Sequence, residues 1–241
     1  MVSATWMYGA LIVAAASFVH GLAGFGIGLV SLALLPLLMS PVMAVVLMTI
    51  YALVFSLAMF LPLRRELQLR ALVLLSVGTL VGTPFGVWLL AVLPASVLTR
   101  LIGVALIVIV LLEWLGLYPE RVGARGWALG AGVVAGLAGG AVGTPGPPVV
   151  LYTAAQGWSP RAVKSTLQAF FVVNQGVILI GYWWAGLVTR EVWQVAALFL
   201  VPAAAALAAG IALFNRVDQA RFRKIVFAVL FASGAVLVVR G

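Results

Sequence analysis

Long runs of uncharged, apolar residues alternate along the chain with short clusters of basic and turn-forming residues. No charged residue precedes Arg64, and several later runs exceed the roughly 20 residues that a helix needs to cross a bilayer. Apolar runs bounded by charges and turn residues predict helical segments in a membrane. The pattern predicts eight apolar segments: 5–39, 41–62, 71–93, 99–118, 127–157, 161–186, 191–214 and 221–240.

The composition indicates an all-α integral membrane protein. Of the 241 residues, 65% are hydrophobic and 8% are charged, whereas a soluble domain has about a quarter charged residues. The net charge of +9 comes from residues between the apolar segments, so we expect anchoring of cytoplasmic loops and no nucleic-acid partner. The chain has no cysteine. Disulfides and thiolate metal sites are therefore excluded, and we expect no cofactor and no metal site.

The chain contains an internal duplication. The sequence GLAGFGIG at 21–28 returns as GLAGGAVG at 136–143, with five of eight positions identical. Ser-Pro at 40–41 pairs with Ser-Pro at 159–160, and 86–100 aligns with 210–224 without a gap. Duplicated hydrophobic segments that glycines interrupt are typical of secondary transporters. The sequence therefore predicts an N-terminal repeat, 1–119, and a C-terminal repeat, 120–241, each with one broken segment followed by three spans.

The basic residues favour segments that enter the membrane and return. If all eight segments crossed, Lys and Arg would divide seven to seven between the two sides. If 127–157 returns to its starting side and 5–39 does likewise, the division becomes eleven to three, as the positive-inside rule requires. About 14 residues before Gly21 would also form a helix of only about 20 Å, too short to span. Three spans per repeat then make the two repeats inverted.

The two glycine motifs are the candidate solute site. Non-helical backbone inside a bilayer requires protein or a wet cavity to satisfy its polar groups, and the N-terminus of a following half-helix favours an anion. The run Thr-Pro-Gly-Pro-Pro at 144–148 predicts a half-helix that begins near Pro147. The alternative is tight helix packing through Gly132, Gly136 and Gly140. The candidate residues at the two motifs are His20, Gly24, Phe25, Gly26, Gly28, Gly139, Gly140, Gly143 and Thr144.

Segment 161–186 adds polar side chains to the candidate site. Gln168 and Gln175 share one helical stripe, and Asn174 lies on another face. Buried amides are costly in lipid, so we expect these three residues to contact the solute. The alternative for them is hydrogen bonding between helices. His20 is the single histidine. The alternative to a role in anion binding is a neutral ring that is hydrogen-bonded to backbone carbonyl groups.

The duplicated glycine motifs, the Ser-Pro after each and the charge-poor layout in two halves resemble the TauE/SafE family of sulfite-exporter-like membrane permeases. The resemblance implies a multi-pass protein of a bacterial or archaeal inner membrane. It also implies transport, as export, of small sulfur-containing or organic anions such as sulfite or sulfonates. Independently, no carboxylate lies in the middle of an apolar segment to bind a cation, and the helix ends favour an anion.

We therefore expect a secondary transporter that moves its anion across the membrane by alternating access around the two breaks. The expected partners are a small anion and the lipid bilayer, and a homodimer stays open as the assembly. One alternative is a passive anion channel, which uses the same helix ends without alternate closure. Another is an uptake carrier for other small organic anions. We expect no enzyme, because one histidine and no cysteine give no catalytic set.

Overall fold

The computed structural model describes residues 4–116, 125–213 and 219–240, and all regular secondary structure in these ranges is helical. The prediction of an all-α membrane protein is confirmed. Within the described ranges, six segments are long and apolar enough to cross a bilayer. They are Trp6–Ala23, Pro41–Glu66, Leu69–Val92, Ala95–Leu112, Pro160–Trp184 and Arg190–Leu213.

Helices follow the predicted segments closely, and both predicted broken segments are broken. The first half contains α1 (Ala4–Ala23), α2 (Ile27–Leu34), η1 (Leu35–Leu37), α3 (Pro41–Phe60), η2 (Leu61–Glu66), α4 (Leu69–Val92) and α5 (Ala95–Trp114). The second half contains α6 (Arg125–Val142), α7 (Gly146–Ala154), α8 (Pro160–Trp184), α9 (Arg190–Leu213) and α10 (Gln219–Arg240). The predicted segment ends at 118 and 214 lie outside the described residues. The predicted span 221–240 is a helix, but it is not among the six candidate spans.

The described helices form two compact units, and each unit takes helices from both halves of the chain. Unit 1 contains α1, α2, the beginning of α3, α5, α9 and α10. Unit 2 contains the rest of α3, α4, α6, α7 and α8. The repeats 1–119 and 120–241 describe duplication along the chain and stay a prediction.

In unit 1, α1 packs beside α9 and runs in the same direction. The ring of Trp6, near the beginning of α1, lies 6.2 Å from the ring of Phe199, in the middle of α9. Near their ends, Gly21 meets Gly210 so closely that a Cβ atom on Gly21 would lie 2.5 Å from the carbonyl oxygen of Leu207. Glycine at these positions lets the two backbones touch, as in membrane helix pairs with small residues at the contact.

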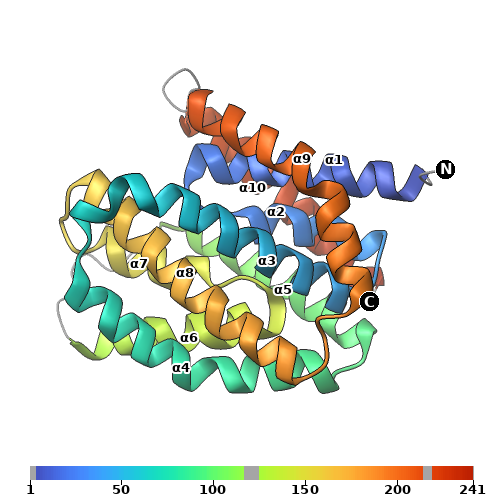
Figure 1. The fold of residues 1–241 in the computed structure, drawn as a ribbon, viewed down its shortest axis with the longest axis horizontal. Coiled ribbons are helices and arrows are strands. Elements are labelled where there is room, and N and C mark those ends of the chain that lie inside the picture. Colours follow the sequence, from blue (N-terminus) through green and yellow to red (C-terminus); the bar gives the residue numbers. More distant parts are fainter. Residues whose placement is uncertain (1–3, 117–124, 214–218, 241) are drawn as a thin grey trace. The chain divides into compact units, whose positions relative to one another are not determined.

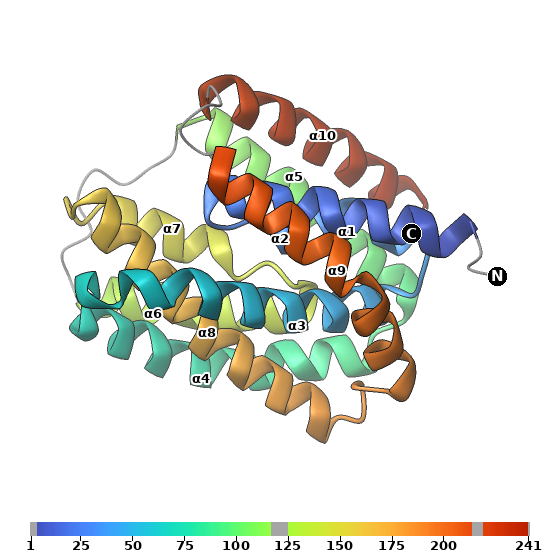
Figure 2. The same cartoon turned by 45° about the horizontal axis from the view of Figure 1, so that its top comes forward.

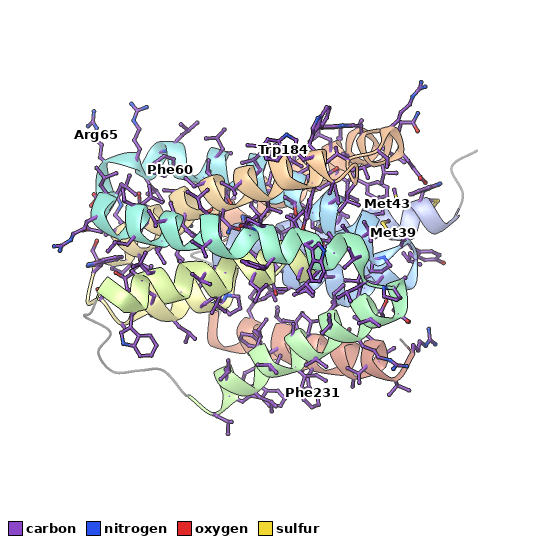
Figure 3. All side chains as sticks on the ribbon, turned by 90° about the horizontal axis from the view of Figure 1, so that it is seen from below. Met39, Met43, Phe60, Arg65, Trp184 and Phe231 are labelled. Carbon is purple, nitrogen blue, oxygen red and sulfur yellow. The ribbon has the colours of Figure 1, made fainter. Side chains whose placement is uncertain are left out.

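The α5 and α10 helices of unit 1 run in opposite directions. A Cβ atom on Gly103 would lie 3.0 Å from the amide nitrogen of Val238, near the end of α10. Further along α5, Trp114 stacks on Phe231, with ring centroids 5.4 Å apart. Phe231 lies where α10 passes beside α5 (Figure 3).

In unit 2, α4 packs in the same direction as α6 through glycines on both helices. Gly78 meets Gly132, and a Cβ atom on Gly86 would lie 3.0 Å from the amide nitrogen of Ala141. Gly82 lies between them, where a Cβ atom would overlap the carbonyl oxygen of Val133. This close approach confirms the packing alternative for the glycines of α6 that face α4.

The α4 and α8 helices of unit 2 also run in the same direction. The Gln68 amide, just before α4, donates to Thr166 Oγ1 at 3.1 Å. Asn174 bonds Thr79 two to three turns later, and Gly181 packs on Val87 after that. This shared direction bears on how the chain crosses the membrane.

Both broken segments double back on themselves. In Figures 1 and 2, α2 returns along α1 after the first break, and α7 returns along α6 after the second. If α4, α5 and α8 each cross the bilayer, a shared direction of α4 and α8 requires that 125–154 leaves by the side at which it enters. If α3 also crosses, the shared direction of α1 and α9 requires the same of the first broken segment. The packing directions thus agree with the re-entrant topology that the basic residues favour.

The arms of the hairpins are unequal, and the expected short first arm was wrong. α1 has 20 residues and α6 has 18, which makes them about 30 and 27 Å long, whereas α2 has 8 residues and α7 has 9. The helix continues through the first glycine of each motif, Gly21 or Gly136, and that glycine packs against a neighbouring helix. Each break comes later in its motif.

Candidate functional site

The first break is a three-residue turn, Gly24-Phe25-Gly26, between α1 and α2. Gly24 has φ 79° and Gly26 has φ 102°. Residues other than glycine rarely adopt such a backbone conformation. The Gly24 amide still donates to the carbonyl oxygen of His20, at 2.8 Å, so the turn is anchored to the last turn of α1. Phe25 and Gly26 are half-buried.

The beginning of α2 is rich in backbone donors. The first hydrogen bond of this helix runs from the Val30 amide to the carbonyl oxygen of Gly26, at 3.0 Å. The amides of Ile27, Gly28 and Leu29 precede that bond, and the first N–H groups of a helix have no acceptor within it. The positive end of α2 and these three N–H groups are suited to an anion.

His20 lies in the last turn of α1, directly before the first break, and its side chain is buried. One turn earlier, Ser17 donates to the carbonyl oxygen of Val13 at 2.7 Å, so this hydroxyl belongs to its own helix. The structure therefore places His20 in the helical turn that leads into Gly24, Phe25 and Gly26.

The second break is Gly143-Thr144-Pro145, and it comes about one helical turn later in the motif than the first. Gly143 has φ 64°, and its amide donates to the carbonyl oxygen of Gly139 at 3.0 Å. Thr144, which is buried, donates its amide to the carbonyl oxygen of Ala138 at 3.3 Å. α7 then begins at Gly146, next to the predicted position.

Proline makes the second break poorer in backbone donors than the first. Pro147 and Pro148 occupy the second and third positions of α7, and proline has no N–H group. Gly146 therefore contributes the one backbone donor among the first three positions, where α2 has three. Sequence analysis correctly took these prolines as a helix start, but it did not count the donors that they remove.

Tyr182 of α8 satisfies the carbonyl end of α6. Its hydroxyl donates to the carbonyl oxygen of Gly140 at 2.7 Å and lies 3.4 Å from that of Gly139. The side chain is fully buried. Sequence analysis missed Tyr182, although a tyrosine within an apolar helix needs a partner for its hydroxyl, and that need is a usable signal.

Asn174 is the polar residue of α8 that the structure brings to the second break. Its Nδ2 donates to Oγ1 of Thr79 on α4, and its Oδ1 lies 3.3 Å from the place of a Cβ atom on Gly139. Gln168 and Gln175 are also buried in α8. Gly140 packs against α4, because a Cβ atom on Gly140 would lie 2.9 Å from the Val87 amide nitrogen.

The predicted site residues divide between the two units. Within the described residues, no three His, Asp or Glu side chains group as a metal site would require. Unit 1 contains His20, Gly24, Phe25, Gly26 and Gly28, and unit 2 contains Gly139, Gly140, Gly143, Thr144, Gln168, Asn174 and Gln175.

A family model described as sulfite exporter TauE/SafE matches residues 9–237, which include both breaks and nearly the whole chain. The chain belongs to the TauE/SafE family. TauE/SafE proteins are membrane transporters and not enzymes, and the candidate spans agree with a multi-pass TauE/SafE protein. No curated protein and no solved structure matches the chain.

Proposed function

We propose that this TauE/SafE protein is a secondary transporter that exports small sulfur-containing or organic anions, such as sulfite or sulfonates, across an inner membrane. The observation that carries the proposal is the first break. There, the three leading amides of α2 follow a turn of two left-handed glycines, beside the buried His20. Such a helix start is an anion site that needs no charged side chain.

The distribution of charge supports an anion over a cation. All five acidic residues, Glu66, Glu113, Glu120, Glu191 and Asp218, lie outside the two broken segments. The carbonyl end of α6 would attract a cation, but the Tyr182 hydroxyl already occupies the oxygen of Gly140. A negative solute therefore meets donors and positive helix ends at these breaks, without a facing carboxylate.

We propose alternating access around the two breaks as the mechanism. The glycines of α1 and α9, and of α4 and α6, bring the backbones of each pair into direct contact, so the two helices of a pair cannot come closer. Each pair therefore moves as one piece, and exposure of the anion changes through other contacts. Such alternation distinguishes a carrier from a passive channel.

Sulfite export from proteoliposomes tests the proposal, with Gly26→Ala as the variant. The φ of 102° strains any side chain at this position, although space is available, because the nearest atom to a Cβ is 3.8 Å away. We expect Gly26→Ala to lose most of its flux. The control is Gly130→Ala in α6, where a Cβ atom would meet nothing within 4 Å.

Three results would contradict this proposal. Equal flux in Gly26→Ala and wild type would remove the first break from the pathway. Single-channel currents, or flux that does not saturate with sulfite, would identify a passive anion channel instead. Saturating uptake of other organic anions without sulfite export would identify the uptake carrier.

A further inference from the structure

A row of hydroxyl groups runs along the buried face of α4. Ser76, Thr79 and Thr83 are spaced by three and four residues, which places them on one side of the helix. Thr79 and Thr83 are 0% and 2% exposed and lie against α6 at Gly136. A Cβ atom on Gly136 would lie 2.9 Å from Thr79 Oγ1 and 2.8 Å from the Thr83 amide nitrogen. The sequence analysis gave this row no role.

The hydroxyls of Ser76 and Thr83 differ from those of Ser17 and Thr153. Ser17 and Thr153 donate to carbonyl oxygens four residues earlier in their own helices, at 2.7 and 2.9 Å, which is the usual solution in an apolar helix. In the part of the chain that the structure describes, Thr83 Oγ1 and Ser76 Oγ have no hydrogen-bond partner. A buried hydroxyl without a partner costs free energy, so Thr83 is a donor in need of an acceptor.

Asn174 adds another buried polar atom without a partner. Its Nδ2 is bonded to Thr79, whereas its Oδ1, next to Gly139, has no partner among the described residues. A half-turn of the amide exchanges the oxygen and the nitrogen, and the Thr79 hydroxyl can donate as well as accept. The Thr79–Asn174 pair therefore keeps its own bond while it turns an N–H group towards the last turn before the second break. A bound anion favours that orientation.

The charges of the surrounding helices suit a negative ligand. The sequences of α4, α6, α7 and α8 contain no acidic residue, and Arg70, Arg161 and Lys164 lie in the first turns of α4 and α8. Arg65, just before α4, extends away from the helices at the η2 end (Figure 3). Neutral hydroxyl and amide donors beside the break bind an oxyanion without the tight hold of a buried cation, which suits a solute that must leave again.

We propose that Thr83 and Asn174, with Thr79 as the positioning residue, form an oxyanion-binding site beside the second break. This inference rests on the proposed transport of anions and names the side chains that hold the ligand in unit 2. Neighbours four residues apart on a helix have Cβ atoms about 5–6 Å apart. In this proposal, two oxygens of one sulfite-type anion accept hydrogen bonds from the Thr83 hydroxyl and from the amide that Thr79 positions. These side chains supply the donors that Pro147 and Pro148 remove from α7.

The test is binding of sodium sulfite to purified full-length protein, with Thr83→Val as the variant. Valine has nearly the shape of threonine and removes the hydroxyl alone. We expect the sulfite Kd of Thr83→Val to rise about ten-fold or more, because a hydrogen bond to a charged group is lost. The melting temperature without sulfite should stay equal or rise, because a buried hydroxyl without a partner disappears.

The matched control is Thr153→Val in α7, whose hydroxyl is already satisfied within its own helix. We expect this control to keep the wild-type Kd, and we expect Thr83→Ser, which restores the hydroxyl, to bind nearly as wild type does. A wild-type Kd in Thr83→Val, or a lower ligand-free melting temperature with an unchanged Kd, would overturn the inference alone. Wild-type protein that neither binds nor transports sulfite would overturn the proposed function as well.

Discussion

The Tyr182 hydroxyl donates to the carbonyl oxygen of Gly140 at 2.7 Å, in the last turn of α6 before the second break. Carbonyl groups at the end of a helix have no donor within that helix, so Tyr182 supplies one from α8. The contact removes a negative partial charge from the side at which we propose that an anion binds. It also links α8 to the turn that Gly143 closes.

Replacing Tyr182 by Phe should destabilise the protein and weaken anion binding together. The Gly140 carbonyl group would lose its donor in a buried place, which costs about 1–3 kcal/mol. Thermal unfolding and sulfite binding of the purified protein measure the two effects. Tyr8→Phe is the control, because Tyr8 is 60% exposed on α1. Unchanged stability in Tyr182→Phe would contradict the role of the hydroxyl.

Adding one methyl group between α4 and α6 should be much worse than adding one elsewhere. In Gly82→Ala the new Cβ atom would overlap the carbonyl oxygen of Val133, so the helices must separate, at a cost of about 3 kcal/mol. In Gly176→Ala of α8 the Cβ atom would meet nothing within 4 Å, and we expect equal or slightly higher stability. Yield and melting temperature of the two variants measure the difference, and similar values would show that the contact is loose.

Restoring a backbone donor at the start of α7 should strengthen anion binding. Pro148→Ala adds one N–H group to the first turn, and an interaction of an anion with a helix start is worth about 0.3–1 kcal/mol. We therefore expect a sulfite Kd about two- to five-fold lower. Pro62→Ala is the control, because Pro62 is exposed in η2 and remote in sequence from both breaks. An unchanged or higher Kd in Pro148→Ala would place the anion away from this helix start.

The re-entrant topology of the second broken segment can be checked with single cysteines, because the chain has none of its own. Gly126→Cys at the start of α6 and Ala154→Cys at the end of α7 should react with a membrane-impermeant maleimide from one side. Ala185→Cys, after α8, should react from the other side. All three positions are exposed. Labelling of Gly126→Cys and Ala154→Cys from opposite sides would mean that the segment crosses.

The sequence predicted every described α-helix and the existence of both breaks, because apolar runs, charges and glycines act locally. It did not predict where in the motif each break falls. Gly24 turns the chain in the first half, whereas the aligned Gly139 stays helical and Gly143 turns it in the second. A proline at 145 ends the second turn, while the first relies on two left-handed glycines.

The division of work among the polar residues was less predictable. Asn174 was expected at the site, but Thr79 and Thr83 lie in a run of apolar residues and show their importance only through contact with Gly136 and Asn174. Such contacts join residues far apart in the chain, so periodicity on one helix does not reveal them. For the same reason, Gly140 could not be assigned to packing until its neighbour Val87 was known.

The exchange of partners between the halves has a consequence for biosynthesis. When α6 leaves the ribosome, its partner α4 has already been made. α1 has no such advantage, since α9, on which Gly21 packs at Gly210, emerges near the end of translation. The amino-terminal hairpin must therefore wait, shielded by lipid or by the insertion machinery, until almost the entire polypeptide has been synthesised.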